Sequence, residues 1–182
     1  IKSIIICFLF SFLNNDHELK AKKIIKEYNP DAFVYASSEV VNVIREYERF
    51  SSTAMNAYIG PKTSNYLSNL EGRLKDNGIT SQVRIMQSNG GISTVENSSD
   101  RPIGLLLSGP AGGVIGARST GKNNEISNII TIDIGGTSAD ISVIQDGELR
   151  IKNPRDTEVA NLPVLVPMLD IDAIGAGGGS IA

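Results

Sequence analysis

Cysteine and histidine are almost absent from this sequence. Among 182 residues there is one of each, and there is no tryptophan. The single cysteine, Cys7, excludes a disulfide within the chain and is typical of a reduced, cytoplasmic compartment. Together with His17 it is too small a set for a zinc site. We expect His17, which lies between Asp16 and Glu18, to sit at the start of a helix rather than to act as a catalytic base.

Long apolar runs and blocks of one charge are absent as well. One apolar run, residues 4–13, is too short to span a membrane and is followed by polar residues rather than by a signal-peptide cleavage site. The net charge is −3 without a basic stripe, so neither a membrane nor nucleic acid is an expected partner. We interpret residues 4–11 as a strand in which Cys7 is a buried, unreactive thiol.

The first half of the chain alternates between strand and helix patterns. Asn15 or Asp16 is expected to cap the first helix, and Gly60-Pro61 is expected to break or kink the last one. Asn77-Gly78 is a helix stop signal. This order predicts an α/β layered domain. The expected strands are residues 4–11, 32–36 and 83–87, and the expected helices are 18–28, 37–50 and 51–77.

Glycine is concentrated in the second half, where the pattern changes. Ser108, followed by Pro110, predicts a capped helix start. The small residues over 108–117 would let this helix approach another backbone closely. The expected strands are residues 129–134, 139–145 and 148–152, and the expected turns are 121–124, 135–138 and 146–147.

A glycine-rich hairpin with two acidic residues carries the clearest chemistry. An apolar strand ends in Asp133, a tight turn follows, and Asp140 opens the return strand. Backbone N–H groups that converge in such a turn bind phosphate oxygens, and glycine permits close approach and positive φ. Asp133 could hold Mg²⁺ through waters, and Asp140 could orient a water or brace the turn. The expected phosphate-binding residues are Gly135, Gly136, Thr137 and Ser138.

This hairpin has one structural interpretation besides phosphate binding, and it differs from two familiar nucleotide-binding motifs. An ordinary β-hairpin can use its aspartates to satisfy the turn backbone. The sequence contains no P-loop motif. A Rossmann motif requires a helix directly after the glycines, whereas the alternating residues after Asp140 predict a strand.

Three further groups of residues leave two interpretations open. Residues 45–49 are expected to form a salt-bridged helix face, unless Arg49 contacts a substrate or another lobe. Asp170 and Asp172 face the same side of an extended chain, so they bind a metal or a substrate nitrogen, or they are solvated turn acids. The glycine run that contains Gly177 and Gly178 is a second backbone nest, with these two residues binding a cofactor, or it is a flexible turn.

Ordered blocks of residues cover nearly the whole chain, among them Ser108-Gly-Pro-Ala-Gly-Gly, Asp133-Ile-Gly-Gly-Thr-Ser-Ala-Asp140 and Gly175-Ala-Gly-Gly-Gly-Ser180. Together they resemble the hydantoinase A/5-oxoprolinase family, which includes N-methylhydantoinase and acetone carboxylase relatives. The ordered set is specific, although no single block is. The resemblance implies a ribonuclease-H-like α/β fold of the kind found in actin, sugar kinases and chaperone ATPases, here as an incomplete two-lobe fragment.

The same resemblance implies an activity. Family members use ATP and Mg²⁺ to open cyclic amides such as 5-oxoproline or hydantoins, and relatives carboxylate acetone. The implied function is that of an ATP-dependent cyclic amidohydrolase with Asp133 and Asp140 as catalytic residues, Asp133 also as the metal ligand, and a hydantoinase B-type subunit as partner. The alternatives are a small-molecule kinase on the same fold, or an inactive fragment or nucleotide-binding subunit of a carboxylase-like complex.

The chain starts without a methionine and stops within a glycine run, which indicates an internal fragment. We expect residues 1–107 to be the remainder of a first lobe, 108–117 an inter-lobe helix and 118–182 the start of a second lobe. The resemblance places an N-terminal acidic Gly-Gly-Thr hairpin before Ile1 and a C-terminal remainder after Ala182. The isolated fragment is therefore expected to be inactive. Asp172 stands where relatives would carry a histidine.

Overall fold

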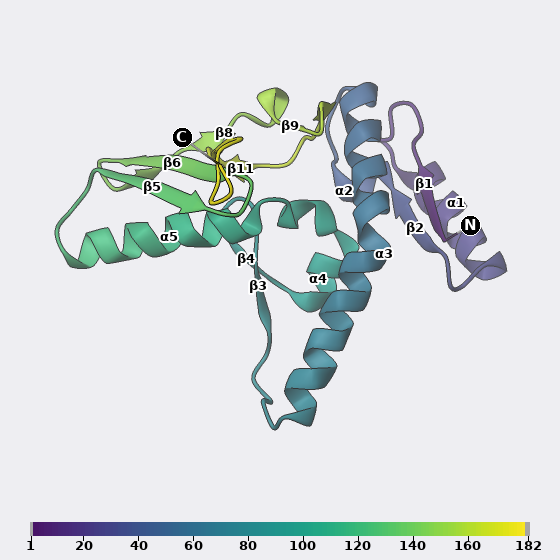
Figure 1. The fold of residues 1–182 in the computed structure, drawn as a ribbon. Coiled ribbons are helices and arrows are strands. Elements are labelled where there is room, and N and C mark those ends of the chain that lie inside the picture. Colours follow the sequence, from purple (N-terminus) through teal and green to yellow (C-terminus); the bar gives the residue numbers. More distant parts are fainter. Residues whose placement is uncertain (1, 181–182) are drawn as a thin grey trace. The chain divides into compact units, whose positions relative to one another are not determined.

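A computed structural model describes residues 2–180 (Figure 1). Its mixed α/β class agrees with the sequence-based prediction. The chain divides into two compact units. The predicted division at residues 107 and 118 into two lobes stays a prediction. Unit 1 combines the residues up to 85 with 93–104 and 154–166, and unit 2 combines 86–92 with 105–153 and the residues from 167 onward.

The first βαβ segment of unit 1 follows the predicted order. β1 (Ser3–Ile6) pairs in parallel with β2 (Phe33–Ala36), and α1 (Asp16–Tyr28) connects them. Ile6, Ala32 and Val34 form the core beneath α1. The strand predicted for residues 4–11 was too long, because the chain turns after Ile6 and Phe10 adopts a positive φ of 57°.

The long helix of unit 1 differs from its prediction in two ways. Residues 41–45 are not helical and separate α2 (Ser37–Val40) from α3 (Glu46–Asp76). The predicted break or kink at Gly60-Pro61 is not a break, since α3 runs through Pro61 (Figure 1). Proline removes one helical N–H, and the carbonyl of Ala57 that this group would have served accepts a hydrogen bond of 2.9 Å from the Ser3 hydroxyl.

The predicted stop at Asn77-Gly78 is confirmed. Gly78 has a φ of 80°, and the N–H groups of Gly78 and Ile79 donate to the carbonyls of Lys75 and Leu74. This pattern closes the last turn of a helix and needs a residue that tolerates positive φ.

The remaining elements of unit 1 and its junctions are short. Thr94 caps α4 by accepting a hydrogen bond of 3.2 Å from the Asn97 N–H. These elements are β3 (Arg84–Met86), β4 (Ile92–Thr94), α4 (Val95–Asp100), a 3₁₀ turn at Pro102–Leu105, a second at Pro154–Asp156, β9 (Glu158–Val159) and β10 (Leu162–Pro163).

Unit 2 packs one helix, α5 (Ser108–Asn123), against a small sheet. The helix is longer than predicted, and the turn expected at residues 121–124 is its last turn. It begins without the predicted serine cap, because Leu107 precedes it in the left-handed region at φ 58°. The core beneath it comprises Ala111, Val114, Ile144, Leu169 and Ile171.

The strands of unit 2 form two sheets. β6 lies between β5 on one side and both β7 and β12 on the other, whereas β8 pairs with β11. The third strand predicted at residues 148–152 is therefore two short strands with different partners. The elements are β5 (Ile129–Ile134), β6 (Ala139–Gln145), β7 (Glu148–Leu149), β8 (Ile151–Lys152), β11 (Met168–Leu169) and β12 (Asp172–Ile174).

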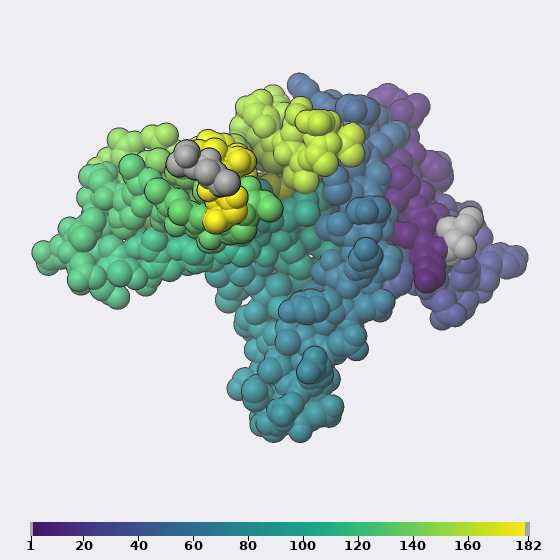
Figure 2. Space-filling model, in the orientation of Figure 1, coloured from purple at the N-terminus to yellow at the C-terminus, as the bar shows by residue number. Residues whose placement is uncertain are grey.

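β5 presents an uncovered apolar face. Ile130, Ile132 and Ile134 alternate along the strand and are 69%, 60% and 64% exposed. Figure 2 shows β5 and β6, in green, at the molecular surface. No helix in the described part of the chain is long and apolar enough to cross a membrane.

Candidate functional site

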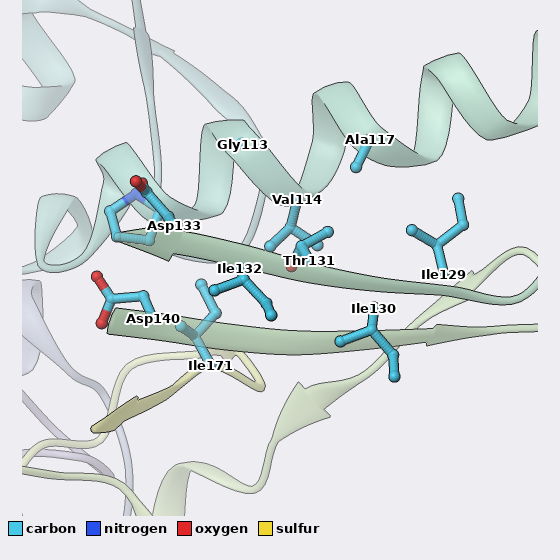
Figure 3. Close-up of a pocket in the computed structure, with 11 residues that line it drawn as sticks. Gly113, Val114, Ala117, Ile129, Ile130, Thr131, Ile132, Asp133, Asp140 and Ile171 are labelled. Carbon is cyan, nitrogen blue, oxygen red and sulfur yellow. The ribbon is translucent and has the colours of Figure 1, made fainter. Parts of the chain in front are cut away.

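Asp133 and Asp140 lie directly opposite each other in the β5–β6 ladder. Cross-strand partners point to the same face of a sheet, and this face carries the buried Ser142 and Ile144 that look toward the core. Figure 3 shows both carboxylates at the same end of the two strands, beside the first turns of α5. The predicted hairpin, with Asp133 at the end of one strand and Asp140 at the start of the next, is therefore present in the structure, which in addition pairs the two residues.

The turn between these strands is closed by one hydrogen bond. The Gly135 N–H donates to the Ser138 carbonyl at 2.8 Å, which leaves Gly136 and Thr137 at the tip. The positive φ predicted for its glycines is wrong: the described glycines with positive φ are Gly78, Gly90 and Gly147. A Cβ atom on Gly136 would meet no atom within 4 Å. Packing therefore does not require glycine at position 136, and the side of Gly136 that a Cβ atom would occupy faces open space.

The glycine run near the end of the chain packs against this tip. The N–H groups of Gly178 and Gly179 donate to the carbonyls of Gly135 and Gly136 at 2.9 and 3.1 Å. The Gly177 N–H donates to the Ser180 hydroxyl at 3.0 Å. The N–H groups of Gly177 and Gly178 are thus used within the protein, and a direct cofactor contact of these residues stays a prediction.

A pocket of about 370 Å³ opens beside the two aspartates within unit 2. One wall is α5 and the other is the edge of β5 (Figure 3). Its walls are mainly apolar, and its charged groups are gathered where the strands meet the start of the helix. The lining residues are Pro110, Gly113, Val114, Ala117, Ile129, Ile130, Thr131, Ile132, Asp133, Asp140 and Ile171.

The small residues of α5 were expected to allow close backbone approach. At Gly109, Gly113 and Gly116 a Cβ atom would meet nothing within 4 Å, so this expectation is wrong for them. Gly113 instead lines the pocket. The close approach occurs at Gly121, where a Cβ atom would stand 2.7 Å from the Ile126 carbonyl oxygen. Spacing of small residues alone did not distinguish a packed helix face from an open one.

Asp170 and Asp172 are both close to Lys152. The Lys152 ammonium group donates to Asp172 at 2.8 Å and lies 3.6 Å from Asp170. The hydrogen bond that Lys152 donates to Asp172 is the main cause that raises the pKa of Lys152 above its usual value. Within residues 2–180, no group of three or more histidine, cysteine or acidic side chains could hold a metal ion. Asp170 and Asp172 thus share the Lys152 ammonium group in a local ion-pair network, and a metal or substrate role for them stays a prediction.

A buried polar cluster lies in unit 1, and the sequence analysis did not predict it. Arg49 is fully buried, and its ion pair with Glu46 at 3.7 Å agrees with the salt-bridged helix face predicted for residues 45–49. Its guanidinium group donates to the Phe8 carbonyl at 2.6 Å and stacks over Phe12 and Phe50. The Arg45–Glu48 pair does lie on the surface. Helical periodicity could not reveal the burial, because the loop that covers Arg49 comes from residues 8–12.

Glu18 is the acidic member of this region. Burial raises the pKa of its carboxyl, but hydrogen bonds from the N–H groups of Phe8 and Ser38 and from the Ser37 hydroxyl outweigh burial and hold the pKa below its usual value. The neighbouring His17 is exposed at the start of α1, as predicted. Burial and the nearby Glu18 charge raise the pKa of the half-buried Cys7 thiol to about 11, in agreement with an unreactive thiol.

Comparison with known proteins gives consistent matches. A profile of the family described as Hydantoinase/oxoprolinase matches residues 49–182. The solved structure of an ATP-dependent caprolactamase from Pseudomonas jessenii superposes with a TM-score of 0.86 at 34% identity over 100% of this chain and 26% of that one. A nucleotide-free acetone carboxylase structure, from work on ATP-dependent acetone carboxylation, gives 0.84 at 31% identity over 97% of this chain and 25% of that one.

Among curated proteins, the 5-oxoprolinase of Saccharomyces cerevisiae is 39% identical over 100% of this chain and 14% of its own length. The caprolactamase and acetone carboxylase relatives are named as an alpha and a beta subunit, respectively. The chain thus spans about a quarter, or less, of the length of these relatives.

Proposed function

Because the chain belongs to the hydantoinase/oxoprolinase family, we propose that it carries the phosphate- and Mg²⁺-binding hairpin of an ATP-dependent enzyme that opens cyclic amides. The observation that carries the proposal is the pairing of Asp133 with Asp140 beside a turn whose tip, Gly136, is bare backbone. The similarity to 5-oxoprolinase and caprolactamase, which are named for ring amides, supports the substrate class.

The electrostatics of the hairpin favour a metal-bound phosphate over a free anion. Two carboxylates beside the tip would repel phosphate by themselves. A Mg²⁺ ion held by Asp133 would offset that repulsion, since this ion typically binds through one or two carboxylates, retained waters and phosphate oxygens. Asp133 is exposed and can reach such an ion, whereas the half-buried Asp140 is better placed to orient a water or brace the turn. The backbone of the tip, Gly136 and Thr137, would then bind the phosphate, because the Gly135 N–H is already bonded to the Ser138 carbonyl.

This arrangement suits a reaction in which positioning and charge neutralisation do most of the work. The amide oxygen takes the γ-phosphoryl group and ADP leaves. A first water then attacks the activated carbon and the ring nitrogen leaves as the amine, which gives an acyl phosphate. A second water cleaves the acyl phosphate to the carboxylate and inorganic phosphate. The net change is hydrolysis of ATP coupled to hydrolysis of one ring amide. The actin-like two-lobe fold and a hydantoinase B-type partner are part of the same proposal.

A second candidate function is that of a nucleotide-binding subunit in a carboxylase. It is favoured by the similarity to the beta subunit of acetone carboxylase, at 33% identity. Under that alternative, ATP turnover would need a ketone and bicarbonate rather than a cyclic amide. A small-molecule kinase would instead yield a stable phosphorylated product.

The test is made on the full-length protein. We expect ATP to bind in the presence of Mg²⁺ and to bind much more weakly with a chelator. Asp133→Asn keeps the shape but removes the charge, and it should weaken Mg²⁺-ATP binding about 10- to 100-fold. Asp146→Asn, the same change at an exposed turn of the same unit, serves as the control. Equal affinities for both variants would exclude the proposed hairpin function.

Product analysis separates the candidate activities. ADP and inorganic phosphate should appear together with the ring-opened product when 5-oxoproline, a hydantoin or caprolactam is added. Phosphorylated substrate would indicate the kinase, and turnover only with a ketone and bicarbonate would indicate the carboxylase.

A further inference from the structure

The run of glycines before Ser180 contacts the hairpin turn through main-chain hydrogen bonds. Two hydrogen bonds join the runs, from Gly178 to Gly135 and from Gly179 to Gly136. A third, from the Ser180 N–H to the Gly177 carbonyl at 2.9 Å, closes the second run on itself. The two segments are about forty residues apart in the sequence, so this is a tertiary contact and not a local turn.

Gly177 is the point of closest approach. A Cβ atom there would stand 2.7 Å from the Gly136 carbonyl carbon, 2.7 Å from the Thr137 nitrogen and 2.8 Å from the Gly135 carbonyl oxygen. All three are backbone atoms, which cannot rotate away as a side chain can. Gly177 does not have a positive φ, so the requirement for glycine at this position is steric and not conformational.

We infer that Gly177 is a positioning residue that sets where the tip of the hairpin, Gly136-Thr137, stands. The phosphate ligand in this inference comes from the proposed function. The position of the tip comes from the contacts that residues 177–180 make with it. A methyl group at 177 has to push the tip away from the second run. A Cβ atom on Gly136 would meet nothing within 4 Å in the described chain, so there is open space beside the tip. The N–H groups of the tip would then point away from the phosphate.

The same run offers a matched control. A Cβ atom on Gly175 would meet nothing within 4 Å. Gly175→Ala therefore adds the same methyl group, with the same loss of backbone freedom, two residues away from the contact. Ser180→Ala is a milder probe, because it removes the hydroxyl that accepts the Gly177 N–H without adding atoms.

The first measurement is amide hydrogen exchange of the 133–140 segment in the full-length protein. We expect faster exchange there in Gly177→Ala, a smaller increase in Ser180→Ala and no change in Gly175→Ala. Circular dichroism and thermal melting check that each variant is folded. Should Gly177→Ala fail to fold, Ser180→Ala decides alone. Unchanged exchange in Ser180→Ala and in any folded Gly177→Ala overturns the inference.

The second measurement is steady-state ATP turnover with the amide substrate. A displaced phosphate grip should raise KM for ATP on the order of 10- to 100-fold in Gly177→Ala, with KM for the amide unchanged. A purely structural defect would lower the active fraction and leave both KM values unchanged, which overturns the positioning role. Should the unsubstituted protein bind no Mg²⁺-ATP, the proposed function fails, while the exchange data still decide whether Gly177 positions the tip.

Discussion

The hydroxyl of Ser3 in β1 donates a hydrogen bond to the carbonyl of Ala57 in α3, which has no helical donor because residue 61 is proline. A strand thus supplies the hydrogen bond that the helix lacks. This contact explains how a 31-residue helix continues through an internal proline. It also links the start of the chain to the middle of α3 inside unit 1.

Ser3→Ala is predicted to destabilise the protein by about 1–3 kcal/mol, the usual cost of leaving a buried carbonyl unpaired. In a Pro61→Ala background the helix regains its own N–H donor, so the same Ser3→Ala change should cost much less. Urea unfolding of the four proteins measures this double-mutant cycle. Equal losses of unfolding free energy in both backgrounds would show that Ser3 does not stabilise the protein through the Ala57 carbonyl.

Glu18 is predicted to make stability fall at acidic pH. Its folded pKa lies below its unfolded value, so its contribution is complete above the unfolded value of about 4.3 and is lost as the pH falls through the folded pKa. Glu18→Gln cannot show this dependence. Unfolding free energies measured from pH 6 downward should therefore converge for the two proteins, with the unsubstituted one more stable at pH 6. Parallel curves would contradict the prediction.

Cys7 is predicted to react slowly with thiol reagents while the protein is folded. With a pKa of about 11, its thiolate fraction at pH 8 is on the order of 100-fold below that of an unfolded cysteine, whose pKa is near 8.5. Alkylation by iodoacetamide, followed by mass spectrometry in buffer and in urea, measures the difference. Similar rates in both solutions would show that the thiol is accessible and ionised in the fold.

A substitution at an exposed isoleucine of β5 should change stability less in the isolated chain than in the full-length protein. Ile132 is 60% exposed in this chain, so Ile132→Thr is predicted to change the stability of the isolated 182 residues by no more than about 0.5 kcal/mol. It should also reduce binding of a hydrophobic dye. Val114→Ala, at a buried position of α5, is the contrasting variant and should destabilise the protein.

In the full-length protein we expect the same Ile132→Thr change to be clearly destabilising, because a sheet face of this kind is normally covered. Comparable small effects in the isolated chain and in the full-length protein would indicate that the face stays open to solvent.

Local signals in the sequence predicted most of the elements, since caps, stops and strand alternation act over a few residues. The Asn77-Gly78 stop and the Asp133–Asp140 hairpin are examples. The errors arose where a distant group intervenes. Gly60-Pro61 predicted a break or a kink, and the Ser3 hydroxyl, which is distant in the sequence, satisfies the Ala57 carbonyl that the proline leaves without its helical donor.

The site shows the same division between local and distant effects. The sequence predicted a strand that ends in Asp133, a tight turn and a return strand that opens with Asp140, and the ladder of the structure places these two residues opposite each other. No local sequence signal indicated that Gly177 would pack closely against this turn, or that Arg49 would be buried beneath residues 8–12. Both arise from tertiary contacts that leave no periodic pattern.

The seam between the two glycine runs is built from main chain against main chain, so side-chain chemistry scarcely enters it. Its two hydrogen bonds run in step, from residue 178 to 135 and from residue 179 to 136. Inserting or deleting a single residue in either run would put both bonds out of step at once. Changes in loop length, more than changes in polarity, are therefore what this part of the molecule should tolerate least over its evolutionary history.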